Sequence, residues 1–78
     1  MVHVRLLSNG GSIARYSYQP EKAGEEGILS YDFANDGAVV EKLAENDGKS
    51  SFYRAPVVHM IREAGISNLP NEKTLVWY

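Results

Sequence analysis

The chain has 78 residues, no cysteine and a net charge of −2 at pH 7. This length allows one domain over residues 1–78 and no second core. The lack of cysteine excludes disulfides and thiolate zinc sites, and the slight negative charge argues against strong attraction to nucleic acid or to an anionic membrane.

The first elements in chain order are two strands joined by a tight turn. Residues 2–6 alternate apolar and polar side chains, a pattern typical of a half-buried strand. Asn9-Gly10-Gly11 supplies the turn, because glycine readily adopts the positive φ that a tight hairpin needs. Residues 12–19 predict a second strand, which carries three side chains on one face: Ala14, Tyr16 and Tyr18.

A polar loop and a third strand follow. Residues 20–27 contain one proline and two glycines, which favours a loop. Residues 28–33 alternate again and place three large side chains on one face: Leu29, Tyr31 and Phe33. The segment Ala34-Asn35-Asp36-Gly37 then predicts another turn.

Residues 38–47, AVVEKLAEND, allow two interpretations. Val40, Leu43 and Ala44 have helical spacing, and Gly48 stands where a helix could end. The Asp-Gly turn directly before the segment instead favours a hairpin and therefore a strand. We predict a strand here.

The clearest helix signal covers residues 50–64. Ser51 can cap its start, and Gly65 suits the left-handed residue after its end. Pro56 fits a first helical turn and breaks a helix interior, so a start near Arg54 is the alternative. Lys73–Tyr78 predicts a final strand, with Trp77 packed under the helix near Tyr53 or Ile61.

These elements predict an α+β domain with the element order β-β-β-β-α-β. Consecutive strands tend to be neighbours, which predicts an antiparallel five-stranded sheet of order 5-1-2-3-4 with the helix across one face. The other face is expected to be polar or covered by a partner, and its predicted members are Arg5, Leu7, Ile13, Arg15, Ile28, Ser30, Asp32, Val40, Lys42, Val76 and Tyr78.

Charge is divided unevenly along the chain. Residues 21–47 carry eight acidic residues and two lysines, a local charge of −6, and the remainder carries +4. Two interpretations are open. The charges form ordinary solvated surfaces, or a basic surface lies opposite an acidic one and docks a charged partner.

No motif predicts a cofactor or a metal. Gly48-Lys49-Ser50 resembles the end of a phosphate-binding loop, but Leu43 stands where the first glycine belongs. A calcium loop built on Gly37 also fails, because Leu43 then occupies the position of the bidentate glutamate. The glycine pair at 10–11 precedes a strand and not a helix, so it is no dinucleotide fingerprint.

The remaining candidates for a functional site are a histidine–glutamate pair and a cluster of aromatic residues. His59 and Glu63 are four residues apart on the predicted helix, which allows a remote interpretation as a small enzyme. Tyr16 and Tyr18 could stack single-stranded bases, with arginines for the phosphates, or could belong to the core beneath the helix.

We therefore expect a cytoplasmic, non-catalytic protein-interaction or self-association module with no membrane span. Its partner is an unknown protein or a second copy in a homodimer, and single-stranded nucleic acid is the alternative. The candidate partner-binding residues are Arg5, Arg15, Tyr16, Tyr18, Arg54 and Tyr78.

Overall fold

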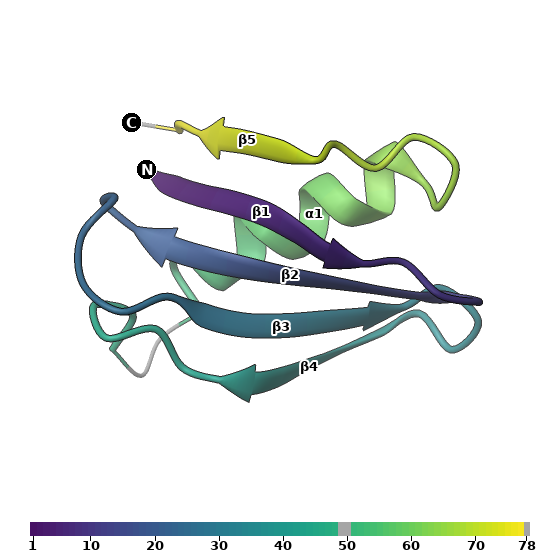
Figure 1. The fold of residues 1–78 in the computed structure, drawn as a ribbon, viewed down its shortest axis with the longest axis horizontal. Helices are drawn as coiled ribbons and strands as arrows, with labels where there is room; N and C mark the ends of the chain where they lie inside the picture. The colour runs from purple at the N-terminus through teal and green to yellow at the C-terminus, as the bar shows by residue number, and fades with distance from the viewer. Residues whose placement is uncertain (49–50, 78) are drawn as a thin grey trace.

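Five strands form one antiparallel sheet, and a helix lies across one of its faces (Figure 1). The computed structural model describes residues 1–48 and 51–77, so Tyr78 lies outside the described residues. Within these residues the elements are β1 (Val2–Ser8), β2 (Ile13–Pro20), β3 (Gly27–Asp32), β4 (Gly37–Lys42), α1 (Arg54–Ala64) and β5 (Glu72–Leu75). The predicted element order is confirmed.

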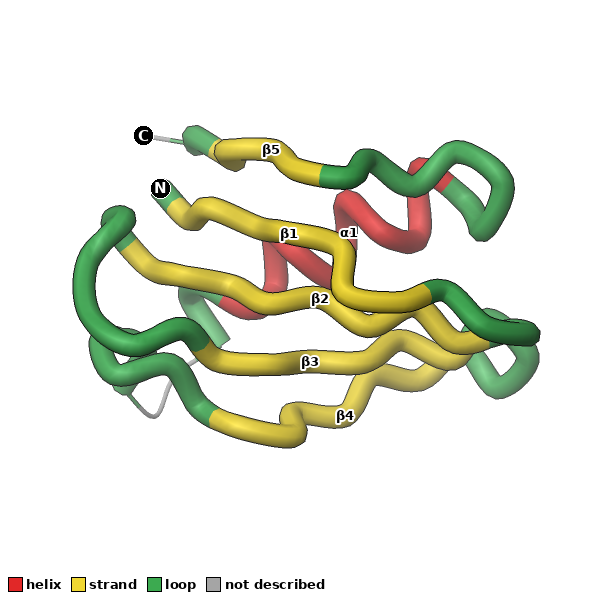
Figure 2. Tube along the Cα trace, viewed as in Figure 1, coloured by secondary structure: helices red, strands yellow, loops and turns green. Residues whose placement is uncertain are grey.

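The strand order is β4-β3-β2-β1-β5, as predicted. All four pairings are antiparallel. β4 and β5 therefore form the two edges of the sheet, and Figures 1 and 2 show β4 as the lower edge and β5 as the upper edge. The prediction of a strand within residues 38–47 is confirmed as far as Lys42, after which the chain turns.

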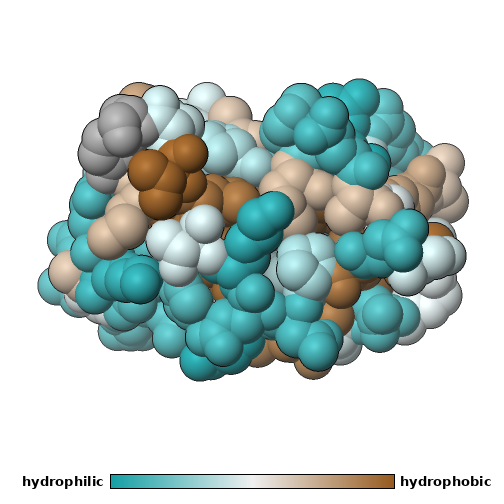
Figure 3. Space-filling model, turned by 90° about the horizontal axis from the view of Figure 1, so that it is seen from above, coloured by the Kyte–Doolittle hydropathy of each residue, from teal (hydrophilic) through white to brown (hydrophobic). Residues whose placement is uncertain are grey.

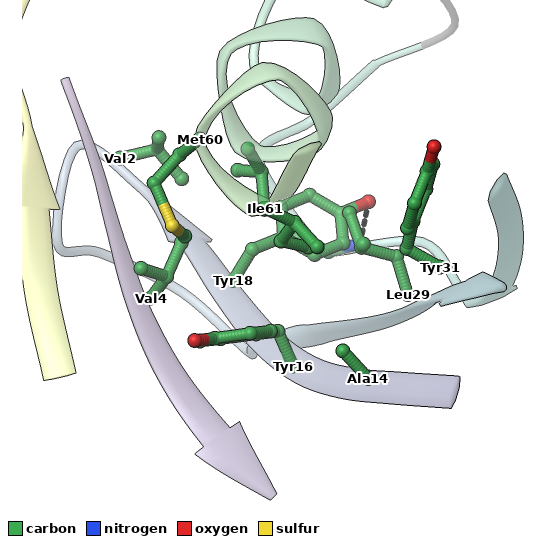
Figure 4. Packing of buried hydrophobic residues seen from close by; sticks show 11 residues of the cluster. Val2, Val4, Ala14, Tyr16, Tyr18, Leu29, Tyr31, Met60 and Ile61 are labelled. Carbon is green, nitrogen blue, oxygen red and sulfur yellow. Dashed lines mark hydrogen bonds between the residues drawn. The ribbon is translucent and has the colours of Figure 1, made fainter. Parts of the chain in front are cut away.

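The core lies between the sheet and α1. Alternate residues of the three central strands point toward the helix (Figure 4), and Tyr16 and Tyr18 have no exposed surface. Ile61 of α1 is equally buried. The buried hydrophobic residues of the core are Val2, Val4, Ala14, Tyr16, Tyr18, Leu29, Tyr31, Ala44, Val57, Met60 and Ile61. The period-two alternation of the strands thus sorts the apolar side chains onto one face, as expected.

Helix α1 begins at Arg54, which agrees with the later of the two predicted starts. Tyr53 occupies the N-cap position without a side-chain hydrogen bond, so the predicted Ser51 cap is wrong. Gly65 ends the helix with a φ of 77° and donates its N–H to the carbonyl of Ile61 over 3.1 Å. Within residues 1–48 and 51–77, no helix combines the length and the apolar character that a membrane crossing requires.

A bulge in β4 shifts the register of its pairing with β3 by one residue. The prediction that Val40 lies on the outer face of the sheet is wrong. Val39 pairs with Ser30, and Val40 pairs with the buried Leu29. Val40 therefore lies on the helix side of the sheet. Val39 lies on the outer face, where Val40 was expected. The irregularity lies where Leu29 pairs with Val40 and Ile28 pairs with Lys42, so Glu41 is the extra residue.

The chain continues to contact the core after the end of β5. β5 ends at Leu75, three residues before the predicted end. The ring of Trp77 lies 5.4 Å from that of Phe52 and 6.0 Å from that of Tyr53, measured between centroids. The predicted contact with Tyr53 is confirmed, although Trp77 packs at the margin of the core and stays half-exposed.

Candidate functional site

The two tyrosines proposed as a base-stacking platform lie inside the molecule. Tyr16 and Tyr18 are completely buried, and the hydroxyl of Tyr16 donates to the carbonyl of Pro70 over 2.5 Å. Burial raises the pKa of Tyr16. Neither ring offers a free face, so the stacking interpretation is wrong for both residues and the core interpretation applies.

Tyr18 and Arg54 meet through Asp47, a contact that the sequence analysis missed. The Tyr18 hydroxyl donates to Oδ2 of Asp47 over 2.5 Å, and Nε of Arg54 lies 2.9 Å from the same oxygen. The side chain of Asp47 has no exposed surface, and that of Arg54 is 21% exposed. Burial, followed by the hydrogen bond with Asp47, raises the pKa of Tyr18 to about 12. Arg54 therefore compensates the charge of the buried Asp47 carboxylate, which is a structural role.

The other two candidate arginines lie on the outer face of the sheet, each beside a carboxylate. Arg5 is 3.2 Å from Glu26, and Arg15 is 3.0 Å from Glu41. Hydrogen bonds from Ser30 and then from Arg15 lower the pKa of the Glu41 carboxyl. The charges of Arg5 and Arg15 on the outer face are thus compensated by carboxylates of the same chain.

This pairing decides between the two interpretations of the charge distribution. Each of the four arginines has an acidic partner from residues 21–47, in the pairs Arg5–Glu26, Arg15–Glu41, Arg54–Asp47 and Arg62–Asp36. The basic and acidic parts of the sequence are interleaved in space. Among the described residues, this pairing favours the interpretation of ordinary solvated surfaces over that of a basic surface opposite an acidic one.

His59 and Glu63 form an exposed pair on the helix surface. Their Nε2 and Oε2 atoms are 3.3 Å apart, and their side chains are 71% and 72% exposed. Pairs four residues apart on a helix are common surface contacts. In the parts of the chain that the structure covers, no group of three histidine, aspartate or glutamate side chains is placed to hold a metal ion.

Among the described residues, a shallow hollow lies on each side of α1. The larger, of about 750 Å³, lies between α1 and β5 and includes Met60, Leu75 and Trp77 in its lining. The smaller, of about 400 Å³, lies between α1 and β4 and includes Val40 and Arg54. Seen from the β5 side (Figure 3), hydrophilic side chains break the apolar surface into separate areas.

The two sheet edges differ in the side chains that they present. β5 is four residues long and begins with Glu72 and Lys73, which are both exposed. All six residues of β4 are exposed, and its middle reads Ala38, Val39 and Val40. Val39 is 63% exposed, so β4 combines an open backbone edge with apolar side chains.

No family model, curated protein or solved structure matches this chain. The function is therefore inferred from the geometry of the chain. Val39 and the β4 edge were not among the candidate partner-binding residues predicted from the sequence. The signal that points to it is the unbroken apolar run AVV directly after an Asp-Gly turn.

Proposed function

We propose that this chain is a small, non-catalytic module that binds another protein chain by strand addition at the β4 edge. The observation that carries the proposal is the exposure of all six residues of β4, with Val39 at 63%. An edge strand presents unpaired N–H and C=O groups, and an added strand satisfies them. In Figures 1 and 2, no described element lies beyond β4.

The ladder pattern shows which backbone groups of β4 face outward. The N–H of Phe33 donates to the carbonyl of Ser12 over 2.8 Å, so these two residues form a hydrogen-bonded pair at the end of the β2–β3 ladder. Hydrogen-bonded and non-hydrogen-bonded pairs alternate along an antiparallel ladder. β4 therefore bonds to β3 through Gly37 and Val39, and its outward groups belong to Ala38 and Val40.

β4 is the better acceptor of the two edges. Charged residues and short length are the usual protections of an edge strand against pairing, and β5 has both. The central part of β4 has neither charge nor proline. The bulge at Glu41 limits the regular edge to residues 37–40, so we expect a short ladder with few hydrogen bonds.

The non-catalytic part of the proposal is supported by the candidate acid–base pair. The His59 and Glu63 side chains are mostly exposed and contact each other where they line the shallow hollow between α1 and β5. General acid–base catalysis needs a group that is held in position against a bound substrate. A pair of side chains that are both more than 70% exposed is typical of a solvated helix surface.

A photo-crosslinking residue at position 39 tests the proposal in cells that make the protein. Position 76 is the matched control, because Val76 is also a valine, is 65% exposed and follows β5 at the opposite edge. We expect a discrete crosslinked adduct from position 39 and none of the same mass from position 76. Equal, diffuse labelling from both positions would contradict strand addition at β4.

A further inference from the structure

We infer that the chain that pairs with β4 is a second copy of this chain, related by a two-fold axis that passes beside Val39. The inference rests on the proposed function, because it names the partner of the same edge. The pairing is antiparallel and joins the two sheets into one ten-stranded sheet. Two-fold pairing is the commonest arrangement of homo-oligomers, and it uses the same patch on both copies.

The backbone geometry selects one register. Residues opposite each other across an antiparallel pair lie on the same face, so only residues of equal parity can pair. The outward groups belong to Ala38 and Val40. Val39 opposite Val39 sets Ala38 of each copy against Val40 of the other, which uses all of these groups within the regular part of the edge. A register centred on Ala38 would instead require Asp36 to pair, and Asp36 has a φ of 49°, which is not an extended conformation. A register centred on Val40 would require the bulged residues after Val40 to pair.

The side chains agree with this register on both faces. On the outer face the two Val39 side chains meet at a non-hydrogen-bonded pair, the type in which side chains come closest. On the helix side each Ala38 meets a Val40, which continues the apolar floor of the hollow between α1 and β4 across the axis. A two-fold axis perpendicular to the sheet keeps both helices on the same side.

Charges at the ends of the edge also fit a second copy. In this register Lys42 at the end of one strand lies opposite Asp36 before the start of the other strand. The two-fold axis produces this arrangement twice. Glu41 comes level with Gly37 and therefore meets no like charge. Opposite charges across a strand pair stabilise it, and like charges destabilise it. Lys42 and Asp36 also pair with Glu25 and Arg62 within one copy, so the ends of the edge bring together no uncompensated like charges.

Sedimentation equilibrium of the full chain tests the inference with two matched variants. We expect the average mass of the natural protein to rise with concentration from 8.7 kDa toward twice that value. Val39→Lys places two ammonium groups opposite each other at the axis and should keep the chain monomeric. Val76→Lys makes the same change at an equally exposed valine of the opposite edge and should dimerise like the natural protein.

A mixing experiment tests the register itself. Val39→Glu and Val39→Lys should each be monomeric, and an equimolar mixture should form a heterodimer, because a carboxylate then faces an ammonium at the axis. Added salt should weaken this heterodimer. Far-UV circular dichroism of each variant shows whether it is folded. A mixture that stays monomeric while both variants are folded contradicts Val39 at the axis.

The outcomes separate this inference from the proposed function. A natural protein that stays monomeric at millimolar concentration overturns the inference. So does a dimer that Val39→Lys leaves intact. If position 39 then crosslinks to a different protein in cells, strand addition at β4 stands and only the identity of the partner is wrong. If position 39 gives no specific adduct and the chain is monomeric, both are wrong.

Discussion

Nε of Arg54 lies 2.9 Å from Oδ2 of Asp47, a carboxylate whose side chain has no exposed surface. The pair joins the start of α1 to the segment that follows β4, on either side of the undescribed residues 49–50. Tyr18 donates its hydroxyl to the same oxygen, so the central strand takes part as well. This cluster ties Asp47 and the start of α1 to the central strand β2.

Replacing Arg54 by methionine should strongly destabilise the fold. The change leaves the Asp47 carboxylate buried without its cation, and breaking a buried pair from one side typically costs about 3–5 kcal/mol. Urea denaturation measures the free energy of unfolding. Arg5→Met is the control, because the pair with Glu26 is exposed and removing it should cost about 1 kcal/mol or less. Equal losses for the two variants would show that Asp47 needs no partner.

Alkaline pH should destabilise the protein through Tyr18. Its pKa is raised from 10.0 to about 12 in the folded state, so the folded protein keeps a proton that the unfolded chain loses. This contribution to stability is complete below pH 10 and declines as the pH rises toward 12. Urea unfolding on both sides of pH 10 measures the decline, and Tyr18→Phe should show a shallower one. Parallel curves for both proteins would exclude Tyr18 as the cause.

Gly27 should tolerate no side chain. A Cβ there would lie 2.5 Å from Cε1 of Tyr18 and 2.6 Å from the carbonyl oxygen of Lys42, and it would also meet the backbone nitrogen of Ala44. Overpacking of this kind costs about 1–3 kcal/mol and more where backbone must move. We expect Gly27→Ala to lower the thermal midpoint clearly. Gly10→Ala is the control, since a Cβ at Gly10 meets nothing within 4 Å.

The C-terminal aromatic segment should contribute to stability. Trp77 contacts the rings of Phe52 and Tyr53, so Trp77→Ala removes one ring of a three-ring aromatic cluster at the margin of the core. Large-to-small changes of buried aromatic residues cost about 3–5 kcal/mol, and we expect the lower end of that range here. Calorimetry measures the loss. Val76→Ala, at a residue 65% exposed, should change stability by about 0.5 kcal/mol at most.

The sheet order and the buried face of each central strand could be predicted because they depend on local patterns. Alternation with period two identified Tyr16 and Tyr18 as members of one face, and the turn residues set the direction of each strand. The register of β4 could not be predicted. A single extra residue at Glu41 places its neighbours Val40 and Lys42 on opposite faces of the sheet, and a bulge leaves no mark in the alternation of so short a strand.

The candidate site was predicted less well than the fold. Arg5, Arg15 and Arg54 were chosen for their charge, but whether an arginine is available depends on its neighbours in space. Each of the three lies beside a carboxylate at least seven residues away in the sequence. The open edge at β4 depends on the order of the strands in space and on the exposure of its side chains, and no candidate partner-binding residue predicted from the sequence lies on it.

The sequence by itself determined the strands, the helix, their order and the apolar face of the sheet, because these follow from the spacing of side chains along the backbone. Tertiary structure decided which charges meet, since antiparallel pairing brings residues 21–47 beside the arginines of the remaining chain. It also decided that Val39 stays outside the core, because its pairing with Ser30 places its side chain on the outer face of the sheet.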